Sequence, residues 1–71
     1  MSELEIVKEG YIFGYKDGIK GRIFDKDNIG NWNFFDAVMF QKGYFMGYKD
    51  SGNKKSLVEC MKSRIEKGEM L

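Results

Sequence analysis

The residues best suited to binding chemistry lie in a block of sequence that occurs twice. Tyr11-Ile12-Phe13-Gly14-Tyr15-Lys16-Asp17 returns 33 positions later as Tyr44-Phe45-Met46-Gly47-Tyr48-Lys49-Asp50. Each copy places two tyrosines four residues apart, with a glycine between them and a lysine after them. Tyrosine rings can stack on nucleic-acid bases or anchor a protein partner. The block therefore predicts a binding surface rather than a reaction centre.

Catalytic chemistry has few residues to draw on. The chain has no histidine, so it lacks the commonest general base and the commonest metal ligand. Its single cysteine, Cys60, excludes an intramolecular disulfide and fits a reducing compartment. Cys60 lies on the apolar side of an expected helix, which predicts a small core residue and not a nucleophile. We expect no enzymatic activity, no catalytic residue and no cofactor.

Three aspartates are the only candidates for a metal site. The spacing of Asp25 and Asp27 resembles the start of a calcium-binding loop. However, the third ligand position is Ile29, and the twelfth is Asp36 where such loops carry a bidentate glutamate. The pattern therefore favours a solvated loop over residues 25–31, and we expect no metal.

Length and composition limit the chain to one small domain. A domain of 71 residues buries only about 60% of its unfolded surface, so its stability depends strongly on its one tryptophan, four tyrosines and six phenylalanines. The net charge of +1 does not favour a polyanionic partner. Lysine outnumbers arginine ten to two, and proline and threonine do not occur, a bias typical of AT-rich genomes such as those of phages and mobile elements.

The same block also determines the fold that we expect. In a strand, residues i and i+4 share one face, so each tyrosine pair would lie on one side of a sheet, and the glycines would allow close packing or a bulge. Asp17-Gly18 is a typical hairpin turn, followed by a polar loop over residues 25–31. The prediction is an α+β fold: an antiparallel sheet of about four strands, in two hairpins, packed on one C-terminal helix. The predicted strands are residues 11–16, 19–25, 33–40 and 44–49.

Two of the segments could also form helices instead of strands. Residues 3–9 alternate imperfectly as a strand, but Ser2 and Glu5 have the spacing of a capping box and Gly10 could end a helix. Residues 32–40 could likewise form a helix that is capped by Asn33 and stopped by Gly43. In both segments the strand is the preferred interpretation.

The C-terminal segment has clear helical periodicity. Ser56 and Glu59 have capping-box spacing, and the apolar residues that follow fall on one side of a helix, while Gly68 is a natural C-terminal stop. The sequence therefore predicts an amphipathic helix over residues 54–67.

A single helix cannot cover a four-stranded sheet, so an apolar sheet face would stay exposed, and such patches mark association sites. We therefore expect a non-enzymatic protein–protein interaction module, such as a phage or mobile-element inhibitor or adaptor, that binds through an aromatic sheet face. A second copy of the chain is among the expected partners, which would give a homodimer. The alternative is a small nucleic-acid-binding domain that uses the aromatic and lysine residues of the sheet. The candidate partner-binding residues are Tyr11, Tyr15, Tyr44, Tyr48, Lys42, Lys49 and Trp32.

The sequence also predicts where the protein is found. No apolar run approaches the ~20 residues needed to cross a bilayer, and the N-terminus lacks the basic start and apolar stretch of a signal peptide. We expect a cytoplasmic protein with no membrane partner.

Overall fold

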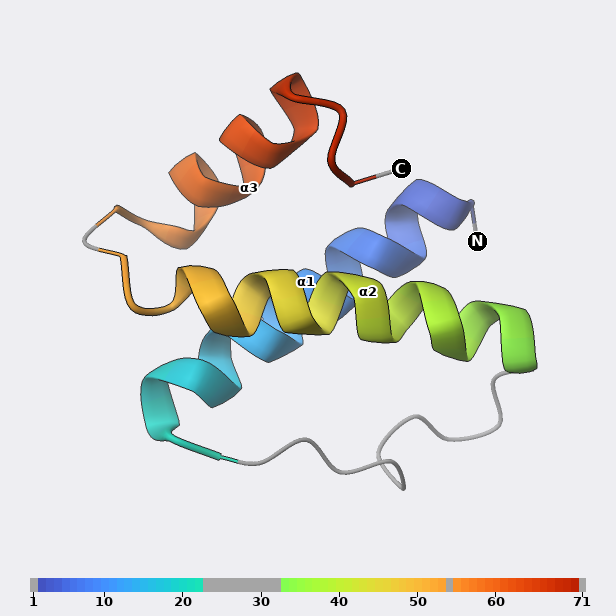
Figure 1. The fold of residues 1–71 in the computed structure, drawn as a ribbon, viewed down its shortest axis with the longest axis horizontal. Coiled ribbons are helices and arrows are strands. Elements are labelled where there is room, and N and C mark those ends of the chain that lie inside the picture. Colours follow the sequence, from blue (N-terminus) through green and yellow to red (C-terminus); the bar gives the residue numbers. More distant parts are fainter. Residues whose placement is uncertain (1, 23–32, 54, 71) are drawn as a thin grey trace.

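A computed structural model describes residues 2–22, 33–53 and 55–70 of the chain. These residues form three helices, α1 (Glu3–Lys20), α2 (Phe34–Asp50) and α3 (Leu57–Glu66), as Figure 1 shows. The described part of the chain contains no strand. The predicted α+β fold with an antiparallel sheet is therefore wrong, and the protein is a small helical bundle.

Helix α1 replaces the first predicted hairpin. Ser2 caps its start, because the Ser2 hydroxyl oxygen accepts the Glu5 amide hydrogen at 3.3 Å. The helix continues through Gly10 and through the expected Asp17-Gly18 turn, and it ends at Gly21 with a φ of 69°. The predicted strand over residues 11–16 is thus helical, as is the start of the one over 19–25, of which residues 23–25 lie outside the described residues.

Helix α2 replaces the second predicted hairpin. The Asn33 side-chain oxygen accepts the Asp36 amide hydrogen at 2.8 Å, so Asn33 is the cap that the helical alternative proposed. Gly43 does not end this helix, which runs on to Asp50. The predicted strands over residues 33–40 and 44–49 therefore form one continuous helix.

Glycines set the distance between α1 and α2. Both helices run from right to left in Figure 1, with α1 crossing behind α2. A Cβ added at Gly14 would lie 2.7 Å from the Tyr44 carbonyl carbon, and one added at Gly47 would lie 2.9 Å from that of Tyr11. Backbone therefore meets backbone at this crossing. Small residues four apart are the usual way to bring two helices this close.

An approximate two-fold axis relates α1 to α2 at this crossing. It relates each residue of α1 to the residue of α2 that lies 33 positions later in the sequence. Gly10 packs on the backbone of Phe40, and Gly43 packs on that of Val7. Gly14 packs on Tyr44, and Gly47 packs on Tyr11. Each contact has a counterpart under the same shift in numbering. The repeated block therefore forms a pseudo-symmetric helix pair.

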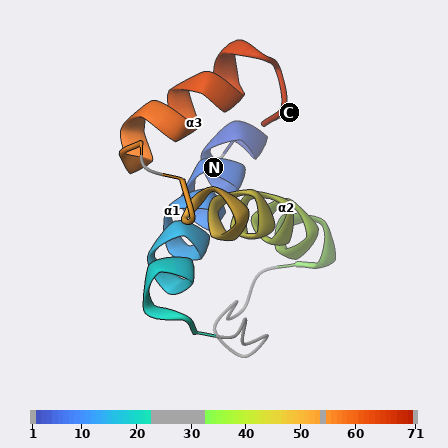
Figure 2. The same cartoon turned by 60° about the vertical axis from the view of Figure 1, so that its left-hand side comes forward.

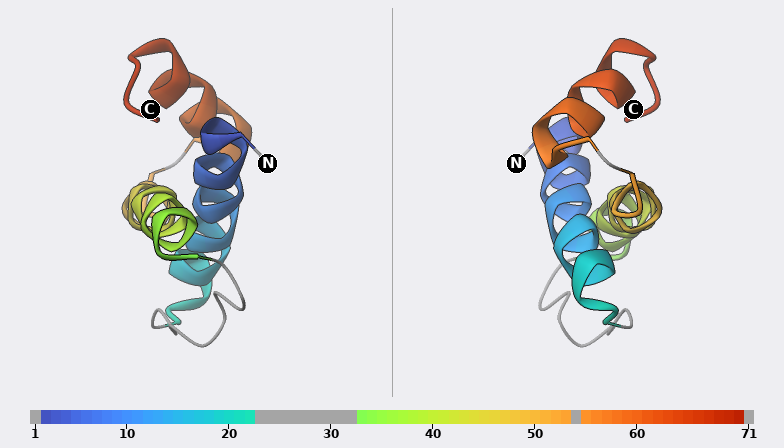
Figure 3. Two further views of the ribbon diagram at one scale, coloured as in Figure 1. Left: turned by 90° about the vertical axis from the view of Figure 1, so that its right-hand side faces the viewer. Right: turned by 90° about the vertical axis from the view of Figure 1, so that its left-hand side faces the viewer.

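Helix α3 occupies one side of this pair. It is found where the sequence predicted a helix, over Leu57–Glu66 within the expected residues 54–67, and Ser56 caps it through the Glu59 amide at 3.3 Å. In Figures 2 and 3 it lies beside the first half of α1. Cys60 of α3 is buried with Tyr11 and Met70 in the main core cluster, which confirms it as a small core residue.

Candidate functional site

The buried tyrosines form two equivalent hydrogen bonds between α1 and α2. The Tyr11 hydroxyl donates to an Asp50 carboxylate oxygen at 2.5 Å, and the Tyr44 hydroxyl donates to an Asp17 carboxylate oxygen at 2.6 Å. The two pairs are related by the same shift of 33 positions. The tyrosine of each copy of the block thus donates a hydrogen bond to the aspartate of the other copy.

Burial makes these phenols poor acids. It raises the pKa of Tyr11 above its ordinary value of 10.0, and the hydrogen bond to Asp50 raises that pKa further. Burial and the hydrogen bond to Asp17 likewise raise the pKa of Tyr44. Both phenols therefore remain neutral hydrogen-bond donors at physiological pH.

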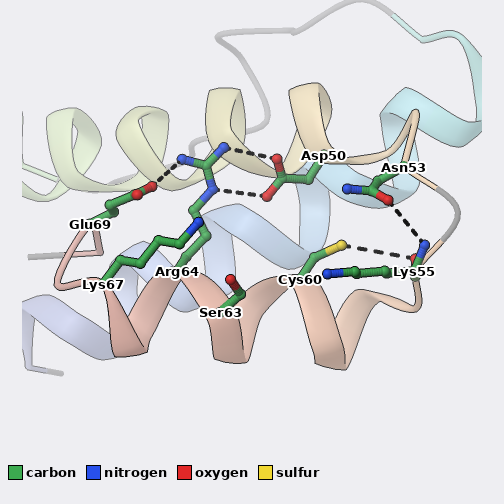
Figure 4. A pocket seen from close by; sticks show the side chains of 8 residues that line it. All are labelled: Asp50, Asn53, Lys55, Cys60, Ser63, Arg64, Lys67 and Glu69. Carbon is green, nitrogen blue, oxygen red and sulfur yellow. Dashed lines mark hydrogen bonds and ion pairs between the residues drawn. The ribbon is translucent and has the colours of Figure 1, made fainter.

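One of the two aspartates is also held by an arginine of α3. Arg64 donates to Asp50 through Nε at 2.9 Å and through Nη2 at 2.8 Å, while its Nη1 donates to Glu69 at 2.6 Å (Figure 4). These bonds lower the pKa of the Asp50 carboxyl below its ordinary value of 3.8, and the bonds to Asp50 raise the pKa of Arg64. The network fastens α3 to the end of α2.

An open cleft of about 270 Å³ lies beside this network. Its lining is polar and is drawn in Figure 4: Asp50, Asn53, Lys55, Cys60, Ser63, Arg64, Lys67 and Glu69. The Arg64 guanidinium already bonds two carboxylates, so it is a structural cation and not a free anion receptor. The Cys60 sulfur lies 3.9 Å from the Lys55 carbonyl oxygen, toward which its thiol points. The hydrogen bonds beside this cleft join α3 to the end of α2.

The predicted tyrosines do not share one exposed face. Tyr11 and Tyr15 are buried against α3, and the Tyr15 hydroxyl donates to the Lys55 carbonyl oxygen at 2.9 Å. Tyr44 is buried in a second cluster with Ile6 and Phe40. Only Tyr48 keeps substantial exposure, at 37%. Whether any of them contacts a partner stays a prediction.

The other predicted binding residues are also separated. Lys42 and Lys49 are exposed seven positions apart on α2, so the helical period places them on one side of it. Trp32 lies outside the described residues. The lysines and Tyr48 do not form one site with the buried tyrosines.

Large apolar side chains that sequence reasoning did not select are exposed instead. Phe34 is 85% exposed, Phe45 58% and Phe13 51%. Phe34, Val38, Phe45 and Tyr48 follow helical spacing along one side of α2, away from its glycines. This stripe was visible in the sequence as a period of 3.6, but only under the helical interpretation of residues 33–50.

The two-fold relation also pairs two surfaces of the helix pair. The first face consists of Val7, Tyr11, Tyr15, Met39 and Met46, and α3 covers it with Leu57, Cys60 and Met61. The second face consists of their counterparts Phe40, Tyr44, Tyr48, Ile6 and Phe13. Its aromatic rings are in contact, with Phe13 and Phe40 centroids 5.7 Å apart and those of Tyr44 and Tyr48 6.1 Å apart.

Other site types find no support in the described residues. Within residues 2–22, 33–53 and 55–70, no three acidic, cysteine or histidine side chains gather as a metal site would require. Asp36 lies in the first turn of α2, and Asp25 and Asp27 are outside the described residues. None of the described helices has the length and apolarity to span a membrane. Comparison with family models, curated proteins and solved structures found no match.

Proposed function

We propose that this protein is a non-enzymatic interaction module that binds a partner protein through exposed aromatic side chains at the edge of the second face, Phe13 and Tyr48. The observation that carries the proposal is the exposure of these two rings, which is 51% for Phe13 and 37% for Tyr48. The centre of the second face is closed, since Ile6, Phe40 and Tyr44 are each 6% exposed or less.

The counterparts of Phe13 and Tyr48 on the first face are covered. Tyr15 on the first face is 8% exposed, whereas its counterpart Tyr48 on the second face is 37% exposed. Met46 on the first face packs against the core that includes α3, whereas its counterpart Phe13 is 51% exposed. Aromatic side chains at the surface are frequent anchors of protein interfaces.

The binding surface differs from the aromatic sheet face that the sequence suggested, because the protein has no sheet in its described part. The nucleic-acid alternative receives less support. Tyr44, one of its proposed stacking residues, is buried and bonded to Asp17. A base could not stack on a ring in that position. Binding to a second copy of the chain is a further outcome that the test below distinguishes.

The test is capture of the partner from an extract of the source cells, with two matched variants. Phe13→Glu introduces a charge on the second face, and Val58→Glu introduces the same charge at a side chain of α3 that is 70% exposed. We expect a protein, identified by mass spectrometry, that the wild type and Val58→Glu retain and that Phe13→Glu loses. With the purified partner, Phe13→Glu should weaken the affinity by about tenfold or more, since a charge would replace an apolar anchor.

Three outcomes would contradict the proposal. Retention that is equal for all three proteins would place the interface elsewhere. Capture of only the chain itself would identify a homodimer. Binding to an oligonucleotide at low salt that is lost in Lys42→Glu, without a protein partner, would favour the nucleic-acid alternative.

A further inference from the structure

The side of α2 that faces away from α1 carries a regular row of side chains. On this side, opposite the glycines of the helix crossing, five positions follow one another at alternating spacings of four and three residues. We call this row the outer seam: Phe34, Val38, Gln41, Phe45 and Tyr48. Alternating spacings of four and three are the pattern by which one helix packs along another. In Figure 3, no other helix of the described residues lies on this side of α2.

The equivalent row of α1 is charged where the outer seam is not. The shift of 33 positions relates Val38 to Glu5 and Gln41 to Lys8. The two helices share one backbone arrangement at their crossing, so this difference lies in the side chains alone. Because charged residues are depleted at the centre of protein interfaces, the uncharged row on α2 is the one suited to contact another helix.

The outer seam is nearly symmetric about Gln41. Phe34 lies seven residues before Gln41 and Tyr48 lies seven after it, while Val38 lies three before and Phe45 four after. If two copies of α2 pair in opposite directions about Gln41, Phe34 of each copy meets Tyr48 of the other, and Val38 meets Phe45. A two-fold interface needs such self-complementarity, so the seam fits a second copy of itself.

The exposed apolar area is sufficient for a weak dimer. Phe34, Phe35 and Phe45 are each more than half exposed, although the Phe45 ring also contacts Tyr44. With roughly 200 Å² for a whole aromatic side chain, their exposed parts amount to about 400 Å². The remaining seam residues bring the area to about 500 Å² per copy, and a pair would bury about 1,000 Å², the lower limit of specific interfaces.

We propose that two copies of the chain form an antiparallel dimer through the outer seams of their α2 helices, with the Gln41 side chains meeting on the two-fold axis. This goes beyond the proposed function, because the occupant is a second copy and Phe13 is not part of the seam. The polar Gln41 pair fixes the register of the two helices and lowers their affinity. The two Lys42 side chains lie beside the axis and repel each other, so added salt strengthens the dimer.

The first test is sedimentation equilibrium of the full chain under reducing conditions. We expect a monomer–dimer equilibrium with a dissociation constant on the order of 100 µM, since an interface of this size is weak. Val38→Glu should raise this constant by about tenfold or more, because it places two charges in the seam. Val58→Glu, the same change at an exposed side chain of α3, should leave it unchanged. Circular dichroism checks that both variants stay folded.

A second pair of variants separates the seam from unspecific association. Gln41→Leu should tighten the dimer by about tenfold, since an apolar side chain replaces the polar one at its centre. Lys8→Leu, which adds the same side chain at the equivalent position of α1, should leave the dissociation constant unchanged. A chain that stays monomeric at about 1 mM, equal effects within either pair of variants, or species larger than a dimer would overturn the proposal.

NMR of the wild type determines the orientation of the two helices. In a sample that mixes ¹³C-labelled and unlabelled chains, an isotope-filtered NOESY spectrum records only contacts between copies. We expect contacts from Phe34 to Tyr48 and from Val38 to Phe45. Contacts of Phe34 with Phe34 of the other copy would indicate parallel helices and overturn the proposal, as would the absence of contacts between copies.

The outcome is separable from that of the proposed function. Phe13→Glu should lose the captured partner and keep the dimer. A dimer without any partner whose capture depends on Phe13 would remove the proposed function and leave this inference intact. Capture that depends on Phe13 by a chain that stays monomeric would do the reverse.

Discussion

The two faces of the α1–α2 pair are related by the shift of 33 positions, but they make different contacts. The first binds α3 and is closed by a network of Tyr11, Asp50 and Arg64. The second repeats the tyrosine and the aspartate, in Tyr44 and Asp17, without the arginine in the described residues. The helix pair is thus approximately symmetric, and among the described residues only the first face holds α3 and Arg64.

The largest effects should come from the glycines, which serve both faces equally. We expect Gly14→Ala and Gly47→Ala each to lower the free energy of unfolding by about 2–3 kcal/mol, because the new methyl group would meet a backbone carbonyl that no rotamer change can move. This loss should outweigh the roughly 1 kcal/mol that alanine gains over glycine in a helix. Urea denaturation measures both values.

The control for this prediction is Gly52→Ala. A Cβ there would lie 3.9 Å from the Lys49 carbonyl oxygen, an ordinary contact, so the change should stay within about 0.5 kcal/mol. Similar losses at Gly14 and Gly47 would support the symmetric crossing. A large loss at one glycine and none at the other would break the comparison.

Substitution of Asp50 and of Asp17 should show how the two faces differ in stability. Asp50→Asn should cost about 2 kcal/mol, because it removes the charge that binds Arg64 in a partly buried network. Asp17→Asn should cost less, about 0.5–1 kcal/mol, since the Asn side-chain oxygen can still accept the Tyr44 hydroxyl. Equal costs in denaturant titrations would mean that Arg64 adds nothing to the first face.

The smallest effect is a pH dependence that arises from Asp50 on the first face. Arg64 lowers the pKa of Asp50 in the folded chain, so the unfolded chain binds a proton at higher pH than the folded one. This contribution to stability is present above about pH 4 and is lost as the pH falls further through the folded pKa. Stability measured from pH 6 to pH 2 should therefore decline less steeply in Asp50→Asn than in the wild type, and identical slopes would refute the assignment.

The repeated tyrosine–glycine block was recognised in the sequence, but it was assigned to strands and forms helices. The spacing of four between Tyr11 and Tyr15 puts both on one face in a strand, and it does nearly the same in a helix. Strands were preferred because these segments are rich in aromatic residues and Asp17-Gly18 is a typical hairpin turn, and Gly10 and Gly43 were interpreted as helix ends. Glycines also weaken isolated helices. Here the helix pair offsets that weakness through close packing, and this contact joins residues far apart in the sequence.

Local signals were more reliable than the assignment of elements. The caps at Ser2, Asn33 and Ser56 were all visible as side chains three residues before an amide that they bond. The C-terminal helix was correctly predicted because its apolar period does not conflict with any glycine. The pairing of Tyr11 with Asp50 could not be predicted without the helix crossing, although the duplicated block contained both partners.

Contacts between the glycines and the opposite helix test the central claim most directly. In a NOESY spectrum of the labelled chain, we expect contacts from the Gly14 Hα protons to Tyr44 and, symmetrically, from the Gly47 Hα protons to Tyr11. Both sets should appear together with the sequential amide contacts of helices. Cross-strand Hα–Hα contacts in these segments, or only one of the two glycine sets, would contradict a pseudo-symmetric helix pair.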